Sequence, residues 1–304
     1  MPCWISARSG CCRGGPREAL LSVLKPVSDI APDRAEPLLE VRDLARTFGA
    51  RDGRAAGLNV IEGLSLAVTE GEFVTVAGPS GSGKSTLLNM IAQTDRPTAG
   101  TIRLRGKTIM DASTSTLTPG WHCQIGYVTQ EDNLLPWRRL EENILLPLRA
   151  QRRLDDAARA RAAALIDTAG LAGFERFYPH ELSGGMRKRA SLVRTLAYDP
   201  PVILMDEPFG ALDAQTRTEL HADLLRLWSL RRKTIIFVTH DITEAIALGD
   251  RVLVLSRAPA RVIDEFRVDL PRPRDIDGLI AAPGFARLYE SIRQALARQA
   301  PRRA

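Results

Sequence analysis

Cysteine is scarce in this chain, and the few cysteines are poorly placed for a disulfide or a metal. Four of the 304 residues are cysteines: Cys3, Cys11 and Cys12 lie close together near the start, and Cys123 stands alone. A disulfide framework or a zinc site needs regular pairing or partner histidines, and neither pattern is present. We therefore expect no metal site there, and a reducing compartment.

Long apolar runs are also missing. No stretch approaches the roughly 20 uninterrupted apolar residues of a membrane-spanning helix, because Arg, Asp or Gly interrupts every apolar run. The beginning of the chain has arginines but no sustained apolar segment, so a secretory signal is not expected. The hydrophobic content of 44% is still sufficient for a full core. We expect a soluble or peripheral protein.

The body of the chain lacks a strong charge of either sign. The net charge is +6, but residues 271–304 carry +4 of it and residues 37–270 only +1. A near-neutral body with a basic end is weak support for a surface that follows a nucleic-acid backbone. We expect no nucleic-acid partner.

Hydrophobic patterning divides the chain into three parts. Residues 1–37 have no sustained period and several Pro and Gly breaks, which indicates a flexible extension. Residues 38–270 contain the ordered elements. Residues 271–304 form a basic tail in which a short helix is predicted over about 284–299.

Two kinds of strand are predicted within the ordered part. Near-alternating apolar residues at 39–41, 64–68 and 102–104 indicate half-buried antiparallel strands. Four other runs are short and almost wholly apolar, which is typical of parallel strands covered by helices on both faces. These runs are EFVTVAG (72–78), PVILMD (201–206), TIIFVTH (234–240) and RVLVLS (251–256). The fold class is therefore α/β.

The stretch AGPSGSGKST has the spacing of a phosphate-binding P-loop, with Gly78, Gly83, Lys84 and Ser85 at the defining positions. It follows an apolar strand and precedes a predicted helix, as the motif requires. Glycines let successive backbone N–H groups curl around an anion, and the helix start adds positive potential. We expect Lys84 to reach the β- and γ-phosphates and Ser85 to hold Mg²⁺.

Two adjacent acidic residues supply the second half of this site. Asp206 ends the apolar strand PVILMD, at the carboxyl edge of the sheet where ligands of open α/β sheets collect. We expect it to bind Mg²⁺, mostly through water. Glu207 follows and is the candidate general base that accepts a proton from the attacking water.

A second glycine-rich stretch, LSGGM at Leu182–Met186, precedes a basic helical run. Ser183 is a natural N-cap, while Gly184 and Gly185 expose backbone N–H groups at the helix start. Taken alone, this pattern is typical of an ordinary capped helix. A chain with a P-loop does not need a second cradle for the same phosphates.

The order of these motifs resembles that of the ATP-binding-cassette (ABC) ATPases over roughly residues 38–270. The motifs that carry the resemblance are Gly78–Thr86, Gln130, Leu182–Met186, Ile203–Pro208, Ala211–Asp213 and His240. The resemblance implies a P-loop NTPase core with an antiparallel β subdomain and an inserted helical subdomain at about 131–198. It also implies ATP and Mg²⁺ as ligands.

In that family two subunits bind head to tail, which gives the second glycine-rich stretch a use. The signature motif of one subunit caps the γ-phosphate held by the P-loop of the other. The resemblance implies that Leu182, Ser183, Gly184, Gly185 and Met186 act on the ATP of the partner. Asp213 would couple the two sites. The family more often has Gln where this chain has Met186, so we expect a changed affinity or rate at most.

The remaining site residues follow from the same resemblance. The implied phosphate-binding residues are Gly78, Pro79, Ser80, Gly81, Ser82, Gly83, Lys84, Ser85 and Thr86. The implied catalytic residues are Glu207, the switch residue His240 and Gln130; the implied Mg²⁺ ligands are Ser85, Gln130 and Asp206. Phe48 stands where the family keeps an aromatic residue that stacks on adenine, although a core Phe is the alternative.

The segment after Gln130 is unusually apolar for a connecting loop. Leu134, Leu135, Pro136 and Trp137 suggest a surface for another helix. In the family this region receives a coupling helix of the membrane subunit. Ordinary core packing is the alternative.

The resulting hypothesis is the ATPase subunit of a membrane transporter, peripheral on the cytoplasmic face of the inner membrane. Its partners would be a second copy, separate permease subunits and a periplasmic solute-binding protein. The stretches LLPWRRLEEN, LSGGMRKR and VDLPRPRD resemble the importer branch for nitrate, sulfonate, taurine and bicarbonate. One alternative is a soluble ABC ATPase that clamps nucleic acid in repair or translation, but such proteins usually carry long coiled coils or two cassettes. A P-loop kinase would not need LSGG.

Overall fold

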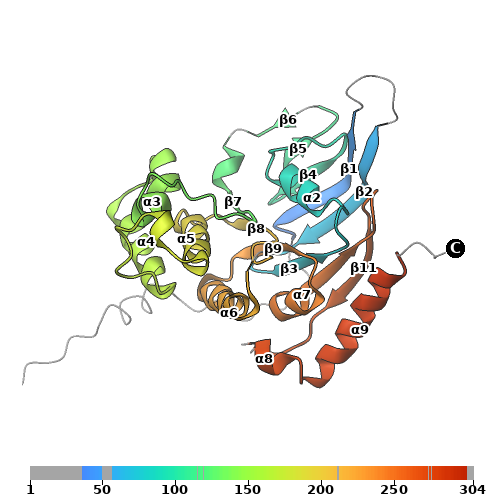
Figure 1. Ribbon diagram of the computed structural model, residues 1–304. Coiled ribbons are helices and arrows are strands. Elements are labelled where there is room, and N and C mark those ends of the chain that lie inside the picture. Colours follow the sequence, from blue (N-terminus) through green and yellow to red (C-terminus); the bar gives the residue numbers. More distant parts are fainter. Residues whose placement is uncertain are drawn as a thin grey trace, which may run out of the picture.

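The structure is a computed structural model that describes residues 36–49, 57–114, 116–118, 120–210, 212–272, 274 and 276–299. Most of the predicted N-terminal extension and the last five residues of the predicted tail lie outside these ranges. Cys3, Cys11, Cys12 and Ala211 lie outside them too. Figure 1 shows a central sheet, a second sheet on one side of it and a group of helices on the other.

The first sheet is antiparallel, as the alternating apolar residues predict. Its strand order is β2-β1-β4-β5-β6. Inward side chains such as those of Leu39, Val41 and Leu44 are fully buried, and their neighbours on the strand face outward. The strands are β1 (Leu39–Phe48), β2 (Leu58–Val68), β4 (Ala99–Leu104), β5 (Lys107–Asp111) and β6 (Thr116–Leu117).

The second sheet has the order β11-β10-β3-β9-β8-β7, and every neighbouring pair but β10–β11 is parallel. The four apolar runs of the sequence form its centre, which confirms the α/β prediction. The strands are β3 (Phe73–Ala77), β7 (Ile125–Val128), β8 (Val202–Asp206), β9 (Thr234–Thr239), β10 (Arg251–Leu255) and β11 (Val262–Arg267).

Both faces of this sheet are covered. On one face α2 (Lys84–Ile91) lies in the same apolar core as the antiparallel sheet, with Val202 and Leu204 of β8. On the other face Ile203 and Met205 pack in the core that contains α6 (Ala214–Arg231). The opposite directions of alternate β8 side chains explain why the run is apolar throughout.

The helical part contains α3 (Leu140–Ala150), α4 (Asp156–Thr168) and α5 (Gly184–Ala197) around a core of their own. Asp155 caps α4, and Gly170 follows it with a positive φ of 66°, as expected for a helix stop. Across the described ranges, no helix combines the length and apolar character that a bilayer crossing requires.

The C-terminal segment packs onto the central sheet more closely than a basic tail would. It contains α8 (Ile276–Leu279) and α9 (Pro283–Ala297), and α9 lies against α7 (Ile242–Leu248), β10 and β11 (Figure 1). Phe285 and Ile292 of α9 share an apolar core with Ile246 of α7.

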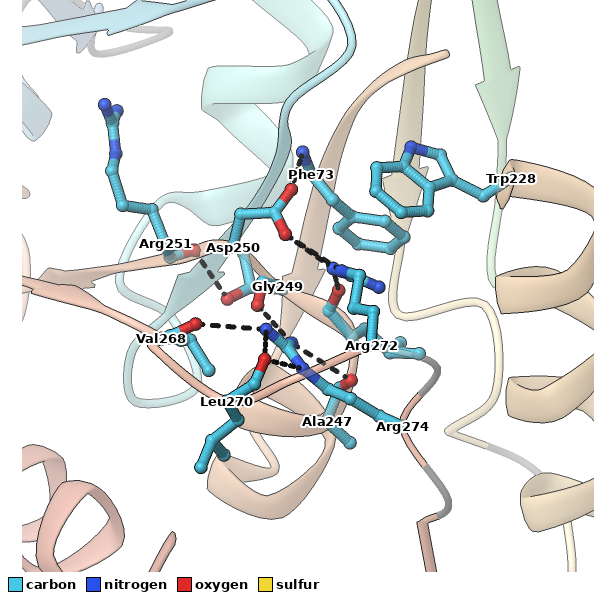
Figure 2. Close-up of polar contacts among 12 residues, drawn as sticks. Phe73, Trp228, Ala247, Gly249, Asp250, Arg251, Val268, Leu270, Arg272 and Arg274 are labelled. Atoms are coloured by element: carbon cyan, nitrogen blue, oxygen red, sulfur yellow. Dashed lines mark hydrogen bonds and ion pairs between the residues drawn. The ribbon is translucent and has the colours of Figure 1, made fainter. Parts of the chain in front are cut away.

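Two arginines anchor this segment (Figure 2). Arg274 is 7% exposed and donates to backbone carbonyls at the end of α7, including that of Ile246 at 3.0 Å, and to that of Val268 at 3.1 Å. Arg272 binds Asp250 at 2.8 Å and lies over the Trp228 ring, 4.3 Å from its centroid. These charges therefore cap a helix end rather than face solvent.

Candidate active site

The P-loop is built for an anion at the start of α2. Gly81 and Gly83 have φ values of 74° and 88°, which glycine adopts without strain. A Cβ on Gly83 would lie 3.0 Å from Val60 Cγ1 of β2, so a larger residue would be crowded as well as strained there. No side chain caps α2, and the buried Ser82 hydroxyl has no hydrogen-bond partner. Uncapped amides and an orphan hydroxyl fit a phosphate.

Lys84 bends back over the loop. Its Nζ donates to the carbonyl oxygens of Gly78 and Pro79, at 2.8 and 3.0 Å, and lies 3.9 Å from Glu207 Oε1. Burial lowers the pKa of Lys84, and the carboxylates of Glu207 and Asp206 partly oppose that shift. The ammonium is therefore held close to the loop, where an anionic ligand would favour its charged form.

The side-chain oxygens of Asp206 and Ser85 lie together at the same edge. The Ser85 hydroxyl donates to Asp206 Oδ1 at 3.0 Å. Burial raises the pKa of Asp206, while the bond from Ser85 acts in the opposite direction. A partly buried carboxylate beside a hydroxyl has the hard-oxygen chemistry that Mg²⁺ prefers.

The three predicted catalytic residues come from separate elements and meet at this edge. His240, directly after β9, places Nδ1 at 2.9 Å from Glu207 Oε2. A Cβ on Gly210 would lie 3.8 Å from both Gln130 Nε2 and Glu207 Oε2, so these two side chains face the same small space. Glu207 has a positive φ of 42°, a conformation that non-glycine residues adopt uncommonly.

The second glycine-rich stretch lies elsewhere. Ser183 caps α5 by accepting the backbone N–H of Met186 at 3.2 Å, and Ser183 and Gly184 are exposed. Gly185 allows close packing on α6, because a Cβ there would lie 3.0 Å from Thr216 Cγ2. Figure 1 shows α5 well apart from α2. Within the described ranges, no hydrogen bond or ion pair joins this stretch to the P-loop.

The other predicted positions have local contacts. Leu182 is buried in the helical core, and Met186 packs against it. Asp213 caps α6 by accepting the Thr216 N–H at 2.9 Å, and this bond lowers the pKa of the Asp213 carboxyl.

Phe48 is 38% exposed, which is unlike a core residue, but the Arg46 guanidinium lies 4.2 Å from its ring centroid. An adenine base could therefore stack only on the other face of the Phe48 ring.

The predicted docking segment 134–137 is only partly a surface. Trp137 is 70% exposed and Pro136 is exposed. Leu134 instead lies in the core of the helical part, 8% exposed, so the alternative of ordinary core packing holds for that residue. A contiguous apolar run does not reveal which of its side chains turns inward.

Lys188 was missed because a basic residue in a basic run suggests a solvated charge. It is 3% exposed, and its Nζ donates to the carbonyl oxygens of Thr129 and Gln130, at 2.6 and 2.9 Å. Burial lowers its pKa to about 8. Lys188 thus holds the backbone at Gln130 itself, and Arg187 and Arg194 of the same helix bind Asp132 and Asn133 of this loop. A sequence signal is its spacing four residues before the apolar Leu192, which places the two side chains on the same side of α5.

Comparison with known proteins relates this geometry to a family. A family model described as ABC transporter matches residues 61–210. An uncharacterised ABC transporter ATP-binding protein of Methanocaldococcus jannaschii is 43% identical over 243 residues, 80% of this chain and 86% of the relative. The nitrate import ATP-binding protein NrtD of Synechocystis is 40% identical, over 77% of this chain and 83% of the relative. The aliphatic sulfonates import ATP-binding protein SsuB of Bacillus cereus is 39% identical, over 78% and 88%.

A solved structure agrees with the fold. It is the dimeric structure of a post-hydrolysis state of an ATP-binding cassette bound to ADP and Pi. The two chains are 32% identical with a TM-score of 0.65, and the match covers 77% of this chain and all of the other.

Proposed function

This chain belongs to the ABC transporter family as an ATP-binding, ATP-hydrolysing subunit, and we propose that it works as a head-to-tail dimer that powers import of a small anion. In this proposal each of two ATP molecules lies between the P-loop of one copy and the Ser183–Gly185 stretch of the other. ATP binding favours the closed dimer, and hydrolysis removes that preference.

The observation that carries this proposal is the separation of two anion-binding elements within one chain. The P-loop has Lys84, Asp206 and Glu207 around it. Among the described residues, no acidic side chain forms a hydrogen bond with Ser183 or Gly184, which are exposed and begin a helix whose N-terminus favours a negative charge. A two-fold axis that brings the second element to the first of another copy would complete two identical sites.

The residues of one chain divide the chemistry between them. Lys84, the loop amides and the Ser82 hydroxyl bind the phosphates, and Ser85, Asp206 and Gln130 would hold Mg²⁺. The metal, when bound, neutralises phosphate charge. Glu207 accepts the proton of the attacking water, and His240, held 2.9 Å from Glu207, contacts the γ-phosphate. Gln130 orients the water and transmits the ligand state to the helical part.

Mixing two inactive variants tests the shared site. Glu207→Gln disables the P-loop side of its own chain, and Ser183→Arg disables only what that chain supplies to its partner. In a random one-to-one mixture about half of the dimers are mixed, and each has one intact site, so about a quarter of the wild-type ATPase rate should return.

The homodimers of each variant are the controls for this mixture. Each homodimer should be nearly inactive while its P-loop still binds ATP. Wild-type activity in the Ser183→Arg homodimer, or a mixture as inactive as its components, would contradict a site built from two chains.

The proposed partners are permease subunits in the membrane and a periplasmic solute-binding protein, and the proposed cargo is an anion such as nitrate, a sulfonate, taurine or bicarbonate. This part rests on the similarity to the nitrate and aliphatic sulfonates import relatives. Purification of the chain from membranes should recover an integral membrane partner. In the reconstituted complex, one of these anions should stimulate ATPase activity, and recovery of nucleic acid instead would contradict the transport proposal.

A further inference from the structure

A buried hydrogen-bond network ties α6 and α7 to the loop that carries His240. Glu244 of α7 is 7% exposed, and its Oε1 lies 2.6 Å from Nε2 of His221 on α6, which is 4% exposed. The other oxygen of Glu244, Oε2, accepts a hydrogen bond from the hydroxyl of the buried Thr239. His221, Glu244 and Thr239 are not part of the proposed ATP site.

The Thr239 hydroxyl fixes the backbone on both sides of His240. Because its one proton goes to Glu244, its oxygen is free to accept, and it accepts the backbone N–H of Asp241 at 3.0 Å. The Asp241 side chain in turn caps α7 by accepting the N–H of Thr243 at 2.8 Å. His240 therefore stands between two residues that are both held by this network.

His221 also contacts the loop that carries Glu207. The ring of Phe209, two residues after Glu207, meets the His221 ring edge-on, with 5.0 Å between centroids. Phe209 is 1% exposed, so it has little room to move. The imidazole thus contacts the loop after β8 directly and is linked to the loop after β9 through Glu244 and Thr239. The side chains of these two loops meet at the 2.9 Å contact between Glu207 and His240.

A buried carboxylate without donors is costly, and this one has two side-chain donors. Without the His221 imidazole, Oε1 of Glu244 would lose its side-chain partner, and the Glu244 carboxylate would no longer be fixed as the acceptor of Thr239. A buried polar pair contributes little to stability compared with apolar side chains of the same size. The position of the His221–Glu244 pair between two catalytic loops therefore says more about its role than its contribution to stability does.

We propose that His221 and Glu244 form a positioning pair that sets the place of His240 relative to Glu207. The pair acts through Thr239 and Asp241 on one side and through Phe209 on the other. It touches neither nucleotide nor water. This inference rests on the proposed roles of Glu207 and His240 in hydrolysis.

The test compares the steady-state ATPase kinetics of full-length variants. His221→Leu, and separately the isosteric Thr239→Val, should lower kcat at least about 10-fold, since small misplacements of catalytic groups cost that much or more. KM for ATP should change less than about twofold, because the P-loop does not depend on the network. His221→Gln, whose amide can donate to Glu244, should keep kcat within about threefold of wild type.

Leu224→Ala is the matched control. Leu224 lies on α6 in the same apolar core as Phe209 and is 1% exposed, but it makes no side-chain hydrogen bond. This variant should lose at least as much thermal stability as His221→Leu and keep its kcat. If it loses kcat to the same extent, or if His221→Leu and Thr239→Val both keep wild-type kcat, the positioning pair is wrong.

A double-mutant cycle with His240→Ala tests whether His221 acts through His240. Single-turnover hydrolysis of labelled ATP detects the slow rates of these variants. In the His240→Ala background, His221→Leu should add no further loss, because its target is already gone; an undiminished effect would overturn the inference. Wild-type activity of His240→Ala alone would instead contradict the proposed role of His240. An inactive His240→Ala beside a fully active His221→Leu would contradict only the positioning pair.

Discussion

Two glycine-rich stretches precede helices in this protein, and their surroundings differ. Around the P-loop, polar and charged side chains from three strand ends converge: Asp206 at the end of β8 with Glu207 after it, His240 after β9, and Gln130 after β7. Within the part of the chain that the structure describes, the Ser183 side chain forms one hydrogen bond, to the start of its own helix. Both stretches place glycines at a helix N-terminus. The P-loop is thus surrounded by the predicted catalytic side chains, whereas the Leu182–Met186 stretch is not.

The difference lies in which strands end nearby. Parallel strands β7, β8 and β9 bring their carboxyl ends to one edge, so residues distant in sequence gather beside the P-loop. The stretch before α5 follows a loop of the helical part and has no such edge. It can bind an anion, but by itself it has no general base to offer.

The largest expected effect on the ATPase rate comes from removal of the proposed general base beside the P-loop. Glu207→Gln should lower kcat by at least about 100-fold, as expected for loss of general-base catalysis, while ATP binding persists because Lys84 and the loop are unchanged. Single-turnover hydrolysis and equilibrium nucleotide binding measure the two properties. Unchanged turnover would remove Glu207 as the base.

A smaller effect is expected from a residue outside both glycine-rich stretches, the buried Arg274. Arg274→Met leaves the carbonyls at the end of α7 without their buried donor, so unfolding should become easier by about 2–4 kcal/mol. Thermal or urea unfolding measures this loss. Arg287→Met, at an exposed position of α9, is the control and should be close to wild type. Equal stability of the two variants would show that the C-terminal segment is not anchored by Arg274.

The smallest effect on the ATPase rate is expected in the second glycine-rich stretch, Leu182–Met186. Met186→Gln should change the ATPase rate by no more than about threefold, because the backbone N–H that Ser183 accepts remains and Met186 packs on the helical core. Steady-state ATPase assays measure the change. A loss as large as that of Glu207→Gln would mean that residue 186 takes part in hydrolysis and that the two stretches are less different than they look.

Features specified by adjacent residues could be predicted. Four apolar runs gave four parallel strands, and the P-loop gave the strand–loop–helix arrangement that its glycines permit. The meeting of Glu207, His240 and Gln130 came from a resemblance rather than from spacing. Their roles in catalysis, the adenine contact of Phe48 and the coupling role of Asp213 stay predictions.

Contacts between distant residues could not be predicted from residue type. Lys188 and Arg274 are of residue types that usually lie at the surface, yet both are buried and donate hydrogen bonds to backbone carbonyls. Leu134 and Trp137 belong to one apolar run, yet only Leu134 turns inward. In each case the partner lies on another element, and the sequence does not state the distance between elements.

The sequence by itself determined the parallel core, the phosphate-binding loop and the acidic strand end, because each depends on the local rules of backbone conformation and apolar periodicity. Only the tertiary structure decided that His221 and Glu244 join two catalytic loops, that Lys188 holds the Gln130 loop, and that the C-terminal arginines cap α7. These depend on burial, which makes every polar atom need a partner and takes that partner from whichever element is near in space.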